Sequence, residues 1–217
     1  MPRLPLFFSC SFLLMVACAS TPSNSEPARV VGTLRYVQDH RMLQTTLRVE
    51  GVGPTDKRTP SVLGSEMRAP TEAGAGLFTD RRQLSLPPEI DLTVPCGQAI
   101  CPVSVPLRMA SGDSIPASMS RTKAQRLRIG QQPLKAGESI VFFFEPVAGN
   151  EPKRLQFMGP TTSAILGLPA ESLRDVPVGD YSFYLVRQGL VQDSTAALVH
   201  KIQTEYFTRS RPLTVVD

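Results

Sequence analysis

Short runs of apolar residues alternate with clusters of Pro, Gly, Asn and Asp along most of the chain from Arg29 onward. The runs are rich in Val, Ile, Leu, Tyr, Phe and Thr, which is typical of antiparallel strands in a sandwich or a barrel. In the first half, they predict strands over residues 29–37, 43–50, 61–68, 77–86, 90–94 and 103–109.

Aromatic residues dominate the strands predicted in the second half. Residues 139–145 carry apolar side chains on both faces of a strand, which predicts that this strand is buried on both sides. A later strand begins at Tyr181 and places Phe183 on the same inward face. We therefore predict that Tyr181 and Phe183 meet Phe142 and Phe144 between two sheets.

Turn residues indicate how these strands divide into domains. Residues 110–114 have turn composition and fall near the middle of the chain. Tyr181, two residues after Gly179, resembles the tyrosine corner of immunoglobulin-like sandwiches, whose hydroxyl bonds back to the chain upstream. The sequence therefore predicts an all-β protein of two tandem antiparallel β-sandwiches, immunoglobulin-like or related, over residues 29–110 and 114–217.

Residues 194–207 fit two interpretations. Leu198, Ile202 and Tyr206 share one face whether the segment is a helix or a strand. We favour a strand, because a last strand paired with residues 181–188 would complete the sheet.

The first residues of the chain have a different composition. Arg3 is the only charged residue before Glu26, and residues 4–17 form an uncharged apolar stretch. This stretch has the length of a signal-peptide core and is shorter than the about 20 residues that a membrane-spanning helix needs. It ends in Leu14-Met15-Val16-Ala17-Cys18, which resembles the lipobox of bacterial lipoproteins except that Met15 stands where the motif most often has Leu.

The resemblance implies where in the cell the protein is located. Residues 1–17 would be removed as a signal peptide, and Cys18 would carry the lipid that anchors the mature chain. Residues 18–28 are rich in Ser, Pro and Asn, as in a flexible tether. Ala19 in place of Asp implies the periplasmic face of the outer membrane. The alternative is a plain secretory signal cleaved near Ala17 or Ala19, with Cys18 incidental.

Cys96 and Cys101 are the cysteines that remain in the folded part under this interpretation. They are separated by four residues, flanked by Pro95 and Pro102, and enclose Gly97. An exported chain meets an oxidising compartment, so this spacing predicts a loop closed by a disulfide. The alternatives are a redox pair or half of a metal site, but redox pairs usually enclose two residues and the sequence has no second ligand pair.

Charge narrows the range of partners. The 217 residues include 23 Lys+Arg and 19 Asp+Glu without a basic run, so the sequence predicts no nucleic-acid partner. Smaller basic groups are Arg81-Arg82, Arg209-x-Arg211 and the cations within residues 121–128. These groups could contact anionic lipid near the tether, or they could lie on the solvated faces of strands. We favour the solvated faces.

Few residues are suited to catalysis or metal binding. The chain has two His, and its Asp and Glu residues do not cluster in sequence. Gly112-Asp113-Ser114 resembles the first block of the Gly-Asp-Ser hydrolases, but Ala197 stands where their late block requires an Asp three residues before His200. His40 lies in a turn-like segment. We therefore predict no catalytic residue, no metal site and no cofactor.

These observations favour a function in binding. We expect a structural or accessory module that docks onto a protein partner in an envelope assembly through strand edges or end loops. The alternatives are a hydrolase of envelope polymers and a carrier of a small hydrophobic ligand. A cleft with convergent Asp, Glu, Ser or His would favour the hydrolase. An apolar cavity between the sheets would favour the carrier, and a closed core would favour the binding module.

Overall fold

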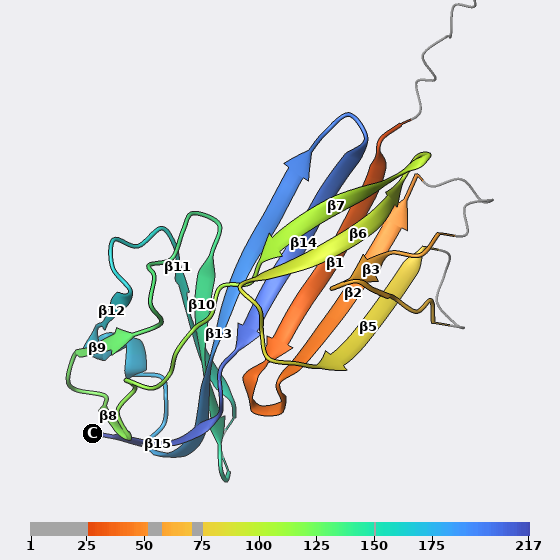
Figure 1. The fold of residues 1–217 in the computed structure, drawn as a ribbon. Helices are drawn as coiled ribbons and strands as arrows, with labels where there is room; N and C mark the ends of the chain where they lie inside the picture. Colours follow the sequence, from red (N-terminus) through yellow and green to blue (C-terminus); the bar gives the residue numbers. More distant parts are fainter. Residues whose placement is uncertain (1–25, 52–57, 71–75, 150) are drawn as a thin grey trace, which may run out of the picture.

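Strands make up most of the part of the chain that this computed structural model describes, residues 26–51, 58–70, 76–149 and 151–217 (Figure 1). These ranges contain no α-helix, and their short 3-10 helices span Gln38–His40 and Ala170–Leu173, so the all-β prediction is confirmed. The strands form two lobes, which share the long strand β13 (Gly179–Ser194).

Lobe one consists of two sheets packed face to face. The larger sheet contains the second half of β13 followed by β14, β1, β2 and β5, and the smaller sheet has the order β4-β3-β6-β7. Figure 1 shows the smaller sheet crossing one face of the larger sheet. The strands of lobe one are β1 (Ala28–Val37), β2 (Met42–Glu50), β3 (Ser61–Val62), β4 (Ser65–Glu66), β5 (Leu77–Gln83), β6 (Glu89–Cys96), β7 (Ala99–Pro106) and β14 (Leu198–Phe207).

Lobe two surrounds the first half of β13. Strands β10 and β15 pair with this half, β11 extends the sheet beside β10, and β8 pairs with β15. Strands β9 and β12 form a separate pair. The strands of lobe two are β8 (Ser118–Ser120), β9 (Gln125–Arg128), β10 (Ser139–Pro146), β11 (Lys153–Met158), β12 (Ile165–Leu168) and β15 (Arg211–Val216).

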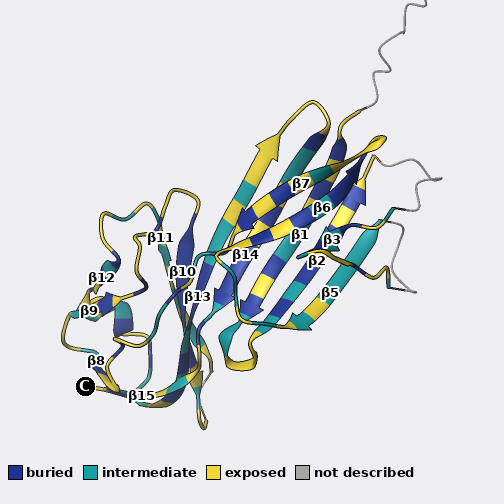
Figure 2. Ribbon diagram, in the orientation of Figure 1, coloured by how far each residue is buried: buried dark blue, intermediate teal, exposed yellow. Residues whose placement is uncertain are grey.

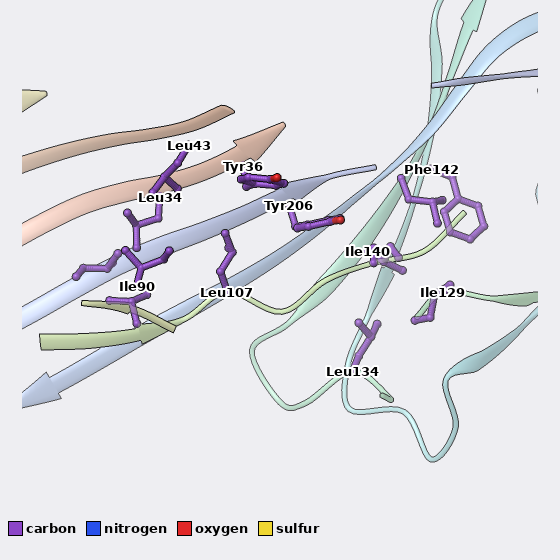
Figure 3. Packing of buried hydrophobic residues seen from close by; sticks show 14 of the residues in the cluster. Leu34, Tyr36, Leu43, Ile90, Leu107, Ile129, Leu134, Ile140, Phe142 and Tyr206 are labelled. Atoms are coloured by element: carbon purple, nitrogen blue, oxygen red, sulfur yellow. The ribbon is translucent and has the colours of Figure 1, made fainter. Parts of the chain in front are cut away.

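Alternating aliphatic residues form the core of lobe one. Along β1, Val30 and Leu34 are fully buried while their neighbours in sequence face outward, as expected for a strand with one covered face. Ile90 and Leu92 of β6 are buried from the opposite sheet. Figure 3 shows Leu34, Leu43 and Ile90 close together in this core, and Figure 2 shows the same alternation as bands of buried and exposed residues.

Aromatic residues form the core of lobe two, as the sequence predicts. The ring centroids of Phe142 and Phe183 are 5.8 Å apart, those of Phe144 and Phe183 are 5.0 Å apart, and all three side chains are fully buried. Tyr181 packs edge-on against Phe144, and its hydroxyl donates a hydrogen bond of 2.6 Å to the carbonyl of Pro177. The hydrogen bond expected from the tyrosine corner is therefore present.

The arrangement of the two lobes differs from two tandem antiparallel sandwiches. Strand β1 pairs in parallel with β14 along its whole length, from Ala28 opposite Leu198 to Val37 opposite Phe207, so the larger sheet is mixed. Lobe one therefore takes β14 from beyond residues 110–114, where the turn predicts a domain boundary. A strand that returns late to pair with the first strand leaves no signal in the composition of that turn.

Two shorter segments refine the predicted strands. Residues 194–207 contain a strand as favoured, but β14 pairs with Val186–Ser194 because β15 occupies Gly179–Phe183. Leu63 and Gly64 have φ values of 48° and 75°, and this turn divides the strand predicted over residues 61–68 into β3 and β4. Local left-handed backbone thus interrupts an otherwise strand-like segment.

Candidate functional site

A cleft of about 770 Å³ lies where the two lobes meet, and is named here the interlobe cleft. One wall is the linker of residues 106–113, which runs from the end of β7 into lobe two. Leu86, Pro87 and Pro88 line the cleft from lobe one, and Gln131 lines it from lobe two. A concave site of this kind, with apolar walls and a few polar groups, is the usual setting for ligand binding.

A buried ion network lies between this cleft and a second cavity of about 330 Å³, because Arg108 and Arg187 line both. The carboxylate of Glu138 accepts hydrogen bonds from Nη2 of Arg187 at 2.6 Å and from Nη1 of Arg108 at 3.2 Å. The side chain of Arg187 is 3% exposed. A charge this deeply buried is stable only when it is paired, as Arg187 is here.

The network also joins the lobes and keeps Glu138 ionised. Arg187 donates further hydrogen bonds to the carbonyls of Gln132 at 3.2 Å and Pro133 at 2.9 Å. Burial by itself would raise the pKa of Glu138, but the hydrogen bonds from Arg187 and from the Lys135 N–H, with the arginine charges, lower that pKa overall. The carboxylate is therefore negatively charged at neutral pH.

Tyr206 is one of the residues that line the cleft. It is 3% exposed, lies on the inward face of β14, and its ring stacks on Tyr36 with centroids 5.7 Å apart. The two rings lie side by side in Figure 3. The Tyr36 hydroxyl donates to the Leu84 carbonyl at 3.2 Å, whereas no described residue hydrogen-bonds the Tyr206 hydroxyl. Burial, with added effects of Tyr36 and Asp113, raises the pKa of Tyr206 to about 12, so this hydroxyl remains a donor.

The rim of the cleft is basic. Arg209 is exposed and Arg211 is half-buried, and neither forms an ion pair within the described ranges. Arg211 does donate a hydrogen bond to the carbonyl of Gly112. Asp113 is the acidic residue of the rim. The residues that line the cleft therefore include a hydroxyl donor and positive charge, which suit an anionic ligand rich in hydrogen-bond acceptors.

The structure joins the two predicted disulfide cysteines. The Sγ atoms of Cys96 and Cys101 are 1.98 Å apart and their Cα atoms 5.9 Å apart. The disulfide lies at the tip of the β6–β7 hairpin, at the opposite end of β7 from the cleft. Arg58 donates hydrogen bonds to the carbonyls of Gln98 and Ala99 at the same tip. The predicted lipidation site, Cys18, lies outside the described residues.

The candidate catalytic residues from the sequence are not brought together. Ser114 is exposed in a turn and donates to the carbonyl of Arg128 at 3.1 Å. His200 pairs with Val30 near the start of β1, whereas His40 follows the end of that strand and is exposed. Neither His lines the cleft, and the described residues contain no group of three His, Cys, Asp or Glu that could hold a metal.

Sequence reasoning did not identify Glu138, Arg187 or Tyr206 as residues of one site. A signal was present for Arg187, since it interrupts the inward-facing series of Tyr181, Phe183 and Leu185 along β13. A charged residue at an inward position of an apolar strand indicates a buried ion pair. Its partner Glu138 is 49 residues away and has no comparable signal.

No protein-family model matches the chain, and no curated protein is similar to it in sequence. Within the ranges that the structure describes, no helix is long and apolar enough to cross a membrane.

Proposed function

We propose that the protein is a lipid-anchored binding module at the periplasmic face of the outer membrane, and that its interlobe cleft binds an extended, acidic segment of an envelope protein. The lipobox-like residues 14–18 support the anchor. The observation that carries the binding site is the hydroxyl of Tyr206, a residue of the cleft lining, which has no hydrogen-bond partner among the described residues. A donor without a partner, on a residue that lines a cleft, is suited to an acceptor on a ligand.

The linker favours a peptide as the ligand. Residues 107–110 form part of the cleft wall, and their backbone N–H groups make no hydrogen bond to described backbone carbonyls. Unpaired N–H groups along a groove bind the carbonyls of an extended chain, as occurs when a peptide adds to a strand. Arg209 and Arg211 at the rim complement acidic side chains on that peptide.

The positions of the cavities favour binding over the two alternative functions. Between the sheets of lobe one, Leu34, Leu47 and Ile90 are fully buried and fill the core, whereas a hydrophobic carrier would need space there. A hydrolase would need a general base beside Ser114, and no His approaches that turn through the described contacts. The core is closed and the open space lies between the lobes, which is the arrangement expected of a binding module.

Purification of the protein from membranes with its anchor intact tests the proposal. The variant Tyr206→Phe removes the unpartnered hydroxyl and keeps the ring stack, so we expect it to retain its fold and to bind the co-purified partner roughly tenfold more weakly. Tyr36→Phe is the matched control, because its hydroxyl bonds to Leu84 and does not line the cleft. Equal recovery of the partner with both variants would show that the cleft is not the binding site.

The anchor has its own test. Intact-mass analysis of the purified chain should show acyl groups on Cys18, and Cys18→Ser should abolish this mass increase. An unmodified Cys18 in a membrane-bound chain would refute the lipid anchor and leave the cleft experiment unaffected.

A further inference from the structure

The larger sheet of lobe one has a basic face. We define its outer face as the side turned away from the smaller sheet, where the exposed positions of β1, β2, β5 and β14 lie. Arg35 on this face pairs with Glu205 at 2.7 Å, and the other cations have no acidic partner in the described ranges. The charged residues of the outer face are Arg29, Arg35, Arg48, Arg81, Lys201, Glu50 and Glu205.

Strand register places exposed apolar residues among these cations. Val31 is 44% exposed and lies directly between Lys201 of β14 and Arg48 of β2. Leu190 of β13, also 44% exposed, lies on the same face opposite Gln203. Apolar side chains bordered by Lys and Arg suit the boundary between lipid headgroups and acyl chains.

The opposite surface of lobe one carries the opposite charge. The outward positions of the smaller sheet include Glu66, Glu89 and Asp91, and its strands β3, β4, β6 and β7 contain no Lys or Arg. Lobe one therefore has a basic side and an acidic side. Near an anionic surface, this asymmetry favours the orientation in which the outer face turns toward the surface.

The predicted anchor is close in sequence to the start of β1, which is a strand of the larger sheet. β1 begins at Ala28, and its second residue, Arg29, pairs with Val199 of β14 and Glu50 of β2. The nine residues 19–27 separate this end of the sheet from Cys18 and span at most about 30 Å when fully extended. A lipid on Cys18 would therefore hold lobe one within reach of the headgroups.

We infer that the basic outer face binds anionic phospholipid headgroups and thereby orients the protein on its membrane. This inference rests on the lipid anchor of the proposed function. Tyr206 and Arg187 occupy inward positions of β14 and β13, on the opposite side from the outer face. Docking through the outer face leaves the interlobe cleft open to a protein partner.

Thiol labelling of the full lipidated chain in vesicles tests this orientation. Val31→Cys reports on the outer face, and Ser65→Cys, exposed on β4, reports on the smaller sheet. In vesicles of phosphatidylcholine with phosphatidylglycerol, labelling of Val31→Cys by a water-soluble maleimide should be roughly tenfold slower than in phosphatidylcholine alone. Ser65→Cys should label at the same rate in both. High salt should abolish the protection, because it screens the charges.

Two charge variants provide the matched comparison. Arg48→Gln with Lys201→Gln removes the cations beside Val31 and should abolish its protection, whereas Arg126→Gln with Arg128→Gln removes two exposed cations of β9 and should leave it unchanged. Equal labelling of Val31→Cys in the two vesicle types, or equal effects of the two charge variants, would overturn the inference. Intact mass measured on the same samples identifies a missing anchor, which would instead refute the proposed function.

Discussion

The two lobes differ in the residues that form their cores and in the sequence separation of the strands that pair within them. Lobe one has an aliphatic core between two sheets and closes only when β14 pairs with β1, at a sequence separation of 170 for Arg35 and Glu205. Lobe two has an aromatic core made by Phe142, Phe144 and Phe183. Most of its strands come from one stretch, residues 118–188.

The comparison shows how one strand can make two regions depend on each other. Strand β13 provides Tyr181 and Phe183 to the core of lobe two, and its other half pairs with β14 in lobe one. Both lobes take a strand from the end of the chain, β14 for lobe one and β15 for lobe two, but the aromatic core of lobe two comes from residues before Gln188. Contacts between distant parts of a chain are costly to form early in folding, so we expect the aromatic core of lobe two to form before β14 completes lobe one.

The largest expected effect comes from the aromatic core. Phe142→Ala removes a fully buried ring that packs against Phe157 and Phe183, and should lower the free energy of unfolding by about 3 to 5 kcal/mol. Because β13 is shared, we expect both lobes to unfold in one transition, as measured by circular dichroism and by amide exchange of β1.

Leu47→Ala in the core of lobe one is the matched variant, with an expected cost of about 2 to 5 kcal/mol. It should also shift a single transition. Two separate transitions, with Phe142→Ala affecting one and Leu47→Ala the other, would show that the lobes are independent despite the shared strand.

The next effect concerns the ion network between the lobes. Glu138→Gln removes the charge that pairs with Arg187 and Arg108, and should cost about 2 to 3 kcal/mol at pH 7. The folded-state pKa of Glu138 is lowered, so its ionisation stabilises the fold at neutral pH. This stabilisation should decline as the pH falls below the ordinary value of 4.5 and disappear below the lowered pKa.

Chemical unfolding of the wild type and Glu138→Gln between pH 7 and pH 3 measures this difference. The stability gap should narrow with decreasing pH. A gap that stays constant over this range would mean that Glu138 contributes through packing and not through charge.

The smallest effect is expected from the disulfide. Cys96→Ser with Cys101→Ser opens a short loop at the hairpin tip, and the chain-entropy model gives a loss of about 2 kcal/mol. The loss should fall on lobe one and leave the aromatic core intact, as judged by urea unfolding with and without reductant. Quantitative alkylation of both thiols in unreduced protein would contradict the structure at this point.

The sequence was most informative where neighbouring positions determine the structure. The alternation in residues 139–145 correctly indicated a strand with Phe142 and Phe144 inward, and the spacing of Gly179 and Tyr181 anticipated the hydrogen bond to Pro177. The disulfide followed from two close cysteines. Each of these features involves residues within a few positions of one another, so its physical cause is present in the local pattern.

Features that depend on distant residues could not be derived in the same way. The parallel pairing of β1 with β14 requires knowing which strands become neighbours, and alternation within a strand does not contain that information. The interlobe cleft has the same origin, since Tyr206 and the linker of residues 106–113 meet only in the assembled fold. The net charge of the whole chain likewise concealed the separation of charge between the two sides of lobe one.

The place of β1 within its sheet has a mechanical consequence. A pull on the N-terminal segment enters the fold at Ala28, and a pull directed along β1 acts on a strand that is paired on one side with β14 and on the other with β2. The hydrogen bonds of a sheet run across the strands, so this load is in shear and is distributed over many bonds at once. An edge strand pulled from its end in the transverse direction would open one bond at a time. Lobe one thus resists tension that is applied along β1 at the end of the chain where a lipid tether would attach.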